Sequence, residues 1–141
     1  MDIDITFPGG KRVDARVGSH VIRTDQPKEA GGDDSAPGPF DLFLASLGTC
    51  AGIYVLGFCQ ARGLSTDGLS LRQHVEIDPA TNLPRKVRID VQLPPSFPSK
   101  YRAAVQRAAE GCKVKKTIAT APVVEVILAP EESALANRAE V

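Results

Sequence analysis

The chain has 141 residues, a length typical of one domain, and its 17 basic and 17 acidic residues leave no formal net charge. This balance excludes a strongly basic surface, so no nucleic-acid partner is expected. The start of the chain is acidic and alternating, unlike a secretory signal, and therefore predicts a cytoplasmic protein. Three cysteines, an odd number, predict reduced thiols rather than a framework of structural disulfides.

Short alternating segments at the amino end predict strands. Residues 2–7 alternate Ile and Phe with Asp and Thr, and a Pro-Gly-Gly turn follows them. Residues 12–17 and 20–24 continue this pattern, which predicts a small antiparallel meander. Residues 27–39 are rich in Gly, Pro and Asp and predict a surface loop that is too short to link two domains.

Residues 39–62 predict a long central helix, with Pro39 in the first turn and Gly63 just past its end. Residues 42–59 carry no charge, which approaches the lower length limit of a membrane span. A span is rejected, because three glycines, a serine and a threonine reduce the hydropathy and no basic anchors precede the segment. A helix apolar on all sides must then be surrounded by protein, and so small a chain needs an intertwined homodimer to do this.

The remainder of the domain is predicted as strands and short helices. Two antiparallel strands are expected at 69–77 and 87–93, because both segments alternate and Asn-Leu-Pro between them suits a hairpin. Helical spacing of apolar residues at 99–111 predicts a second helix that ends at Cys112. Residues 113–117 are expected to form a short helical extension.

The carboxyl end divides into two predicted parts. Residues 123–128, Val-Val-Glu-Val-Ile-Leu, are rich in β-branched side chains and predict a last strand. Residues 131–141 are polar and rich in Ala, and predict a frayed or disordered tail. We therefore expect one α+β domain over residues 1–130, followed by this tail.

Two of the three cysteines, taken alone, give little indication of a reactive thiol. Cys59 lies nine positions after Cys50, on the opposite side of the same helix, and its neighbours supply no cation, so it is interpreted as a buried small side chain. Cys50 also has uncharged neighbours and lies well inside the helix, where the dipole contributes little. Taken alone, Cys50 is interpreted in the same way.

Cys112 changes that interpretation. It lies at a helix junction followed by Lys113, Lys115 and Lys116, cations that favour a thiolate, although lysine runs more often form a solvated face. The only histidines, His20 and His74, lie in predicted strands and no CxxC pair is present. The sequence therefore predicts no metal site and no cofactor.

The segment 37–50, PGPFDLFLASLGTC, and the segment 112–118, CKVKKTI, together resemble the OsmC/Ohr family of osmotically induced and organic-hydroperoxide-resistance proteins. The resemblance covers roughly residues 1–130. It is closer to the OsmC-like branch than to Ohr itself, because that branch shares a P-x-x-L-L-x-x-S-L-G-x-C helix and a C-x-V-x-x-T second site.

The resemblance implies an OsmC-like fold, with antiparallel sheets and two long central helices in an intertwined homodimer, and sites at the subunit interface. It also implies a peroxidase. Cys50 would attack an organic hydroperoxide and become a sulfenic acid, and Cys112 would condense with it to form a disulfide. A dithiol reductant of unknown identity would then regenerate both thiols.

The resemblance further implies an arginine from the amino-terminal strands that stabilises the thiolate. Arg12 matches best, with Arg16 and Arg23 as alternatives. The acidic partner of this arginine departs from the Ohr pattern, because Phe40 occupies the glutamate position. Asp41, one residue later, corresponds to the acidic position of other OsmC-like members and either contributes to the site or caps the helix.

Two other functions stay open at this point. The missing glutamate and the apolar surroundings of Cys50 also fit a dimeric binding protein with a small apolar ligand in an interface pocket. A third interpretation is a protein of the same fold whose thiols are buried and inert.

Overall fold

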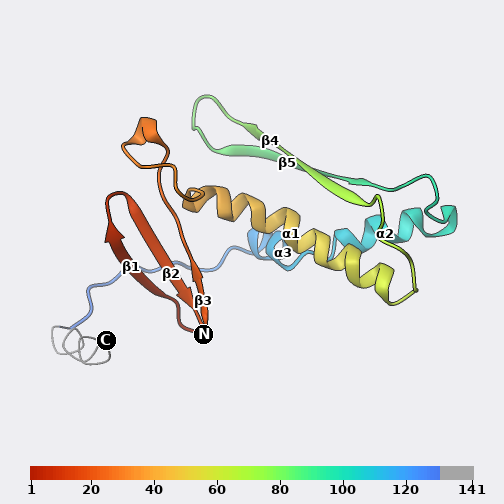
Figure 1. Cartoon of the computed structure of the whole chain (residues 1–141), viewed down its shortest axis with the longest axis horizontal. Coiled ribbons are helices and arrows are strands. Elements are labelled where there is room, and N and C mark those ends of the chain that lie inside the picture. The colour runs from red at the N-terminus through yellow and green to blue at the C-terminus, as the bar shows by residue number, and fades with distance from the viewer. Residues whose placement is uncertain (131–141) are drawn as a thin grey trace.

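The structure, a computed structural model, describes residues 1–130, so the predicted tail at 131–141 lies outside the described residues. Figure 1 shows a small sheet beside the amino end of a long helix, and a long hairpin that runs alongside the same helix. Both sheets are antiparallel, and three α-helices are present in the described part of the chain. The predicted α+β class is therefore confirmed.

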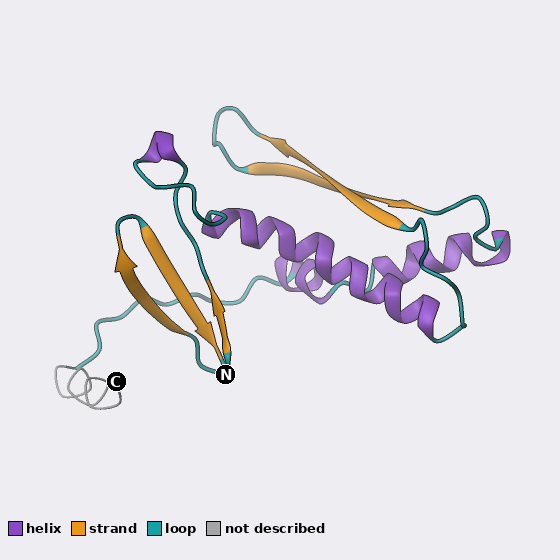
Figure 2. Ribbon diagram, in the orientation of Figure 1, coloured by secondary structure: helices purple, strands orange, loops and turns teal. Residues whose placement is uncertain are grey.

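The first sheet is the predicted meander. Its strands β1 (Asp4–Gly9), β2 (Arg12–Val17) and β3 (His20–Ile22) pair in that order. Gly9 and Gly10 form the predicted turn with positive φ angles of 119° and 62°, a conformation that glycine adopts without steric cost. This sheet makes only marginal contact with the helices and with the second sheet (Figure 2). Its apolar side chains consequently face solvent in the single chain.

Asp25 orders the loop between the first sheet and the long helix. Its buried carboxylate accepts hydrogen bonds from the backbone N–H groups of Gln26, Asp33 and Ser35 at 2.8, 3.2 and 3.0 Å, and from the Ser35 hydroxyl at 2.6 Å. These donors, the Ser35 hydroxyl foremost, lower the pKa of Asp25 to about 2. A Cβ at Gly32 would lie 1.9 Å from the Gln26 carbonyl oxygen, so the loop also requires glycine there.

The long helix α1 (Pro39–Gln60) begins as predicted and ends two residues before the predicted end. Pro39 lies in its first turn, the Asp41 carboxylate accepts the Gly38 N–H at 3.1 Å, and Gly63 follows the helix with a φ of 61°. The residues buried on α1 recur every fourth position and form one stripe: Leu47, Ala51, Val55 and Cys59.

The outer face of α1 stays exposed. Only 22% of the most apolar 18-residue stretch of α1 is buried in the single chain. The prediction that protein surrounds this helix on all sides therefore requires more protein than one copy provides. Among the described helices, α1 alone has the length and composition for a membrane span. That is weak support for a span, because core helices of soluble proteins meet the same criteria.

The second sheet is a hairpin of β4 (Ser70–Ile77) and β5 (Pro84–Gln92), which confirms the predicted antiparallel pair. The second helical region is divided into a 3₁₀ turn, η2 (Ser99–Tyr101), and two short helices, α2 (Arg102–Ala109) and α3 (Lys113–Ala119). Cys112 therefore lies between α2 and α3, at the start of α3. The buried core lies where α1 meets these elements, and contains Val55, Cys59, Phe97 and Val105.

The predicted strand at 123–128 is wrong for the described chain. This segment forms no strand, and its apolar side chains are almost completely exposed, for example 95% at Val126. The local composition suits a strand, but a strand also needs a neighbouring backbone to complete its hydrogen bonds. The segment pairs with neither described sheet, so its propensity alone produces no regular structure.

Candidate active site

The fold brings Cys50 and Cys112 together although 62 positions separate them in the sequence. Cys50 lies midway along α1, and the start of α3 packs against this part of the helix. Cys112 is buried, with 2% of its surface exposed, whereas Cys50 is partly exposed. All three cysteines are free thiols. A buried thiol beside a partly exposed one is an arrangement that permits a disulfide to form between them.

Cys112 is fixed by contacts on both sides. Its sulfur accepts a hydrogen bond from the Lys115 N–H at 3.4 Å, so that Cys112 serves as the N-cap of α3. Its thiol also donates to the Leu47 carbonyl of α1 at 3.8 Å. Cys112 consequently joins the beginning of α3 to the middle of α1.

The surroundings of Cys50 favour its thiolate. The backbone N–H of Val114 is the largest influence that lowers the pKa of the Cys50 thiol. The Cys112 thiol, which can turn its single proton from the Leu47 carbonyl to Cys50, acts in the same direction. So do the N–H and the positive charge of Lys113, while partial burial opposes them. Sequence reasoning placed the cationic influence on Cys112. The structure shows that Lys113 acts on Cys50.

Cys59 has the opposite environment. It is fully buried in the core with Val55 and Val105, as expected for a small apolar side chain. Burial raises the pKa of the Cys59 thiol, and the nearby charge of Arg62 offsets only part of this effect. Cys59 therefore remains a thiol at neutral pH.

The other two predicted site residues lie away from the thiols in the single chain. The exposed Arg12 guanidinium donates to the Gly9 carbonyl at 3.2 Å, within the first sheet, which lies beside the amino end of α1 (Figure 1). Asp41 caps α1 through Gly38. Nine residues of helix correspond to about 13.5 Å along the axis, which is too far for Asp41 to contact Cys50 directly.

A cavity of about 630 Å³ extends from Cys112 between α1, the hairpin and the two short helices. Its walls are mainly apolar. The Cys112 end is bounded by Leu47 and Ala51 of α1, and the far end by Phe40 and Phe43, whose rings stack at 5.7 Å. Phe40, which replaces the acidic residue of the Ohr pattern, is thus part of the cavity wall.

Four of the residues that line the cavity are charged. Three are cationic and one is acidic: Arg85, Lys86, Lys115 and Glu110. Because long basic side chains keep their charges near water, they suit a polar end of a ligand whose body is apolar. This lining was not identified from the sequence, because the cations come from a hairpin and a helix whose packing no local pattern reveals.

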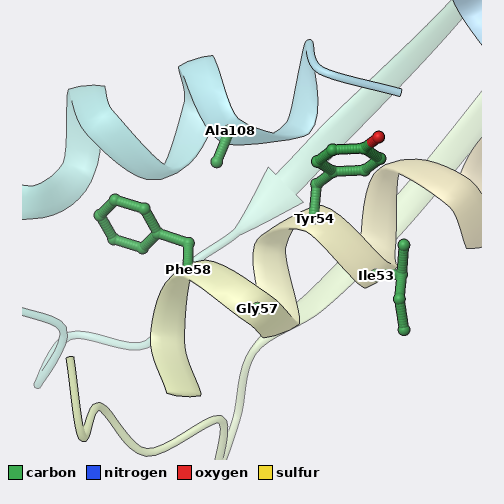
Figure 3. Close-up of a pocket in the computed structure, with 5 residues that line it drawn as sticks. All are labelled: Ile53, Tyr54, Gly57, Phe58 and Ala108. Carbon is green, nitrogen blue, oxygen red and sulfur yellow. The ribbon is translucent and has the colours of Figure 1, made fainter. Parts of the chain in front are cut away.

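A second hollow of about 380 Å³ lies between α1 and α2, and no cysteine lines it. Figure 3 shows Tyr54 and Phe58 of α1 directed toward Ala108 of α2, with Gly57 on the turn between them. The remaining wall is Ile53, which is 60% exposed. This hollow is therefore separate from the thiol site.

The described residues contain no group of three His, Cys, Asp or Glu side chains suited to a metal ion. His74 instead lies 3.2 Å from the Asp90 carboxylate, on an exposed part of the hairpin.

The fold and site together define a mixed helix and antiparallel-sheet protein with paired thiols at a helix junction. The family model described as OsmC-like protein matches residues 32–127, which is more than half of the chain. The chain therefore belongs to the OsmC family. No curated protein matches the sequence at a significant level.

Solved structures share this fold at low sequence identity. An osmotic stress induced and detoxification response protein from Psychrobacter arcticus 273-4 has a TM-score of 0.69 at 20% identity, over 82% of this chain and 85% of that chain. An OsmC-like protein from Mycoplasma pneumoniae has a TM-score of 0.64 at 16% identity, over 85% and 87%. An organic hydroperoxide resistance protein OsmC from Legionella pneumophila has a TM-score of 0.51 at 20% identity, over 84% and 89%.

Proposed function

We propose that this protein reduces organic hydroperoxides through a Cys50 thiolate and a Cys50–Cys112 disulfide. The observation that carries the proposal is the meeting of these two thiols at one junction, with the pKa of Cys50 lowered. Membership of the OsmC family supports it, as does the fold shared with a protein named for organic hydroperoxide resistance. The cytoplasmic location expected from the sequence suits such a thiol enzyme.

The reaction consists of three balanced steps. The Cys50 thiolate attacks one oxygen of the peroxide, the O–O bond breaks, and after proton transfer the products are a Cys50 sulfenic acid and an alcohol. The Cys112 thiol then attacks the sulfenic sulfur, which forms the disulfide and releases water. Two electrons from an external dithiol return both residues to thiols by exchange.

The cavity beside Cys112 supports organic peroxides as the substrates of the proposed reaction. Its apolar walls, including Leu47 and Ala51, can accommodate an alkyl or aryl group, whereas hydrogen peroxide has no such group to bury. Binding of that organic part would hold the peroxide close to the thiols, which is the main advantage of a bound substrate over a free one.

We also propose a homodimer that completes the site. The exposed face of α1 and the isolated first sheet leave apolar surface that a second copy would cover. In such a dimer, the first sheet of the second copy would supply the arginine that the single chain lacks near Cys50. Arg12 is the preferred residue, and Arg16 and Arg23 are the alternatives. Asp41 would act through the start of α1 and not on the thiolate.

Mass spectrometry of reduced protein treated with cumene hydroperoxide tests this function. We expect the wild-type chain to lose two hydrogens as the Cys50–Cys112 disulfide forms, with Cys59 still a thiol. In the Cys112→Ser variant, Cys50 should instead be trapped as a sulfenic acid by dimedone. If all three thiols persist in folded protein after excess peroxide, the proposal is wrong.

A second candidate is a binding protein without catalysis. The cavity of about 630 Å³ and the presence of Phe40 at the acidic position favour it. In that case a fluorescent apolar anion such as anilinonaphthalene sulfonate should bind equally well to wild-type and Cys50→Ser protein, with no oxidation of either thiol by peroxide. Disulfide formation in the same samples would exclude this candidate.

A further inference from the structure

Cys112 has a structural role in the reduced protein that is separate from disulfide formation. Its backbone angles, φ −45° and ψ 119°, lie outside the helical region, as is usual for an N-cap residue. Its sulfur accepts the N–H of Lys115, the third residue of α3, at 3.4 Å. This is the position at which Ser, Thr and Asp side chains usually cap a helix.

The sulfurs of Cys50 and Cys112 divide the first N–H groups of α3 between them. The N–H of Lys115 donates to Cys112, and the N–H groups of Lys113 and Val114 lie on the side of Cys50, where they lower the pKa of its thiol. None of these groups has an acceptor inside α3, because the first turn of a helix leaves its N–H groups free. The direction of the first turn therefore decides whether Cys50 receives its hydrogen bonds.

A helix as short as α3 does not fix that direction by itself. It has seven residues, whereas isolated helices shorter than about 12 residues are marginal in water. None of its residues is buried. Contacts at its beginning therefore contribute much of its order, and the buried Cys112, anchored on the Leu47 carbonyl at 3.8 Å, supplies two of them.

We propose that Cys112 is a positioning residue for Cys50 in the reduced protein, because as the N-cap of α3 it holds the backbone N–H groups of Lys113 and Val114 against the Cys50 sulfur. The same side chain would then prepare Cys50 for attack before it resolves the oxidised product. The relevance to catalysis rests on the proposed peroxidase function, but the positioning itself concerns only the reduced thiols.

Two substitutions at position 112 separate capping from disulfide formation. Neither Cys112→Ser nor Cys112→Ala can form the disulfide, but serine retains a side-chain oxygen that accepts an N–H and is among the preferred N-cap residues. The readout is the rate at which iodoacetamide alkylates Cys50, followed by peptide mass spectrometry across a pH series. Alkylation requires the thiolate, so its pH midpoint follows the pKa of Cys50.

We expect the Cys112→Ala variant to alkylate Cys50 roughly tenfold more slowly at neutral pH, with a higher pH midpoint, since one hydrogen bond to a charged group accounts for such a factor. The Cys112→Ser variant should remain within about twofold of wild type, because its cap is retained. Equal rates in wild type and Cys112→Ala, or equally slow rates in both variants, would overturn the proposal.

A second variant keeps the test valid if Cys112→Ala does not fold. Proline is favoured at the first position of a helix and suits an extended preceding residue, so Lys113→Pro should preserve α3 while removing one N–H donor. Its Cys50 alkylation should be slower than that of Lys113→Gln, which removes only the charge. Equal rates for these two folded variants would contradict the proposal.

A failure of peroxide to oxidise wild-type Cys50 would refute the peroxidase function alone, because the alkylation series needs no peroxide.

Discussion

Two parts of the same helix give a cysteine opposite properties. At the middle of α1, the pKa of Cys50 is lowered by the N–H groups and the charge at the start of α3. At the end of α1, next to its last residue, the pKa of Cys59 is raised by burial in the core with Val55 and Val105. Both residues lie within an uncharged stretch of the sequence. The difference therefore comes from the element packed on each part of the helix.

This comparison shows why apolar surroundings in the sequence are a poor guide to thiol reactivity. A core made only of side chains offers a thiolate no hydrogen bonds, so burial leaves the neutral thiol as the stable form. A helix terminus packed against a cysteine brings polar backbone groups with it. Cys50 is partly exposed as well, which gives a small oxidant access to it.

The largest expected effect comes from exchanging each cysteine for a residue without a thiol. Cys50→Ser should lower the rate of cumene hydroperoxide reduction by at least about 10⁴-fold, because removal of a covalent nucleophile can cost about 10⁶-fold. Cys59→Ala should retain most of the activity of wild-type protein. A coupled assay with an excess of dithiothreitol as reductant measures both rates.

The comparison between the two sites would fail if Cys59→Ala lost as much activity as Cys50→Ser while circular dichroism showed both variants folded. Cys112→Ser serves as the control for turnover without a disulfide, because an external dithiol can reduce a Cys50 sulfenic acid directly.

The next effect concerns stability. Here substitution of Cys59 should cause the larger loss, whereas substitution of Cys50 causes the larger loss of activity. Cys59→Ser places a hydroxyl in the apolar core, where no side chain is arranged to form a hydrogen bond with it. This change should reduce the free energy of unfolding by about 1–3 kcal/mol. Cys50→Ser, at a partly exposed position, should change it by less than about 0.5 kcal/mol. Urea unfolding followed by circular dichroism gives both values. A larger loss for Cys50→Ser would show that Cys50 is the structural residue.

The environment of Cys59 could be predicted from local sequence, and that of Cys50 could not. Phe58 and Gln60 indicated apolar, uncharged neighbours and helical geometry placed Cys59 away from Cys50, although the charge of Arg62 also reaches it. The contact of Cys50 with Cys112 depends on the turn at Gly111, where a Cβ would lie 3.1 Å from both the Ala108 carbonyl oxygen and the Tyr54 ring. No periodicity reveals such a close approach, so the pairing followed only from family resemblance.

The two sheets show the same limit on the scale of the fold. Alternation predicted β1, β2 and the hairpin correctly, since each finds a partner strand a few residues away. The segment 123–128 has comparable propensity but no neighbouring strand within the described chain, and it stays irregular. Strand prediction from one sequence succeeds where the pairing is local and fails where it depends on distant backbone.

The smallest expected effect isolates the charge in the Cys50 environment from its hydrogen bonds. Lys113 is exposed, and its charge is the last in order of the influences that lower the pKa of Cys50, after the backbone of Val114. Lys113→Gln removes the charge and retains the N–H, so the pKa of Cys50 should rise and its alkylation at neutral pH should slow by roughly twofold, since an exposed charge interaction is worth about 0.5 kcal/mol. Added salt should reproduce this slowing in wild-type protein and have little effect on the variant, because salt screens the charge but not the hydrogen bonds. A tenfold slowing, or a salt response unchanged by the substitution, would mean that charge and not the backbone of α3 distinguishes Cys50 from Cys59.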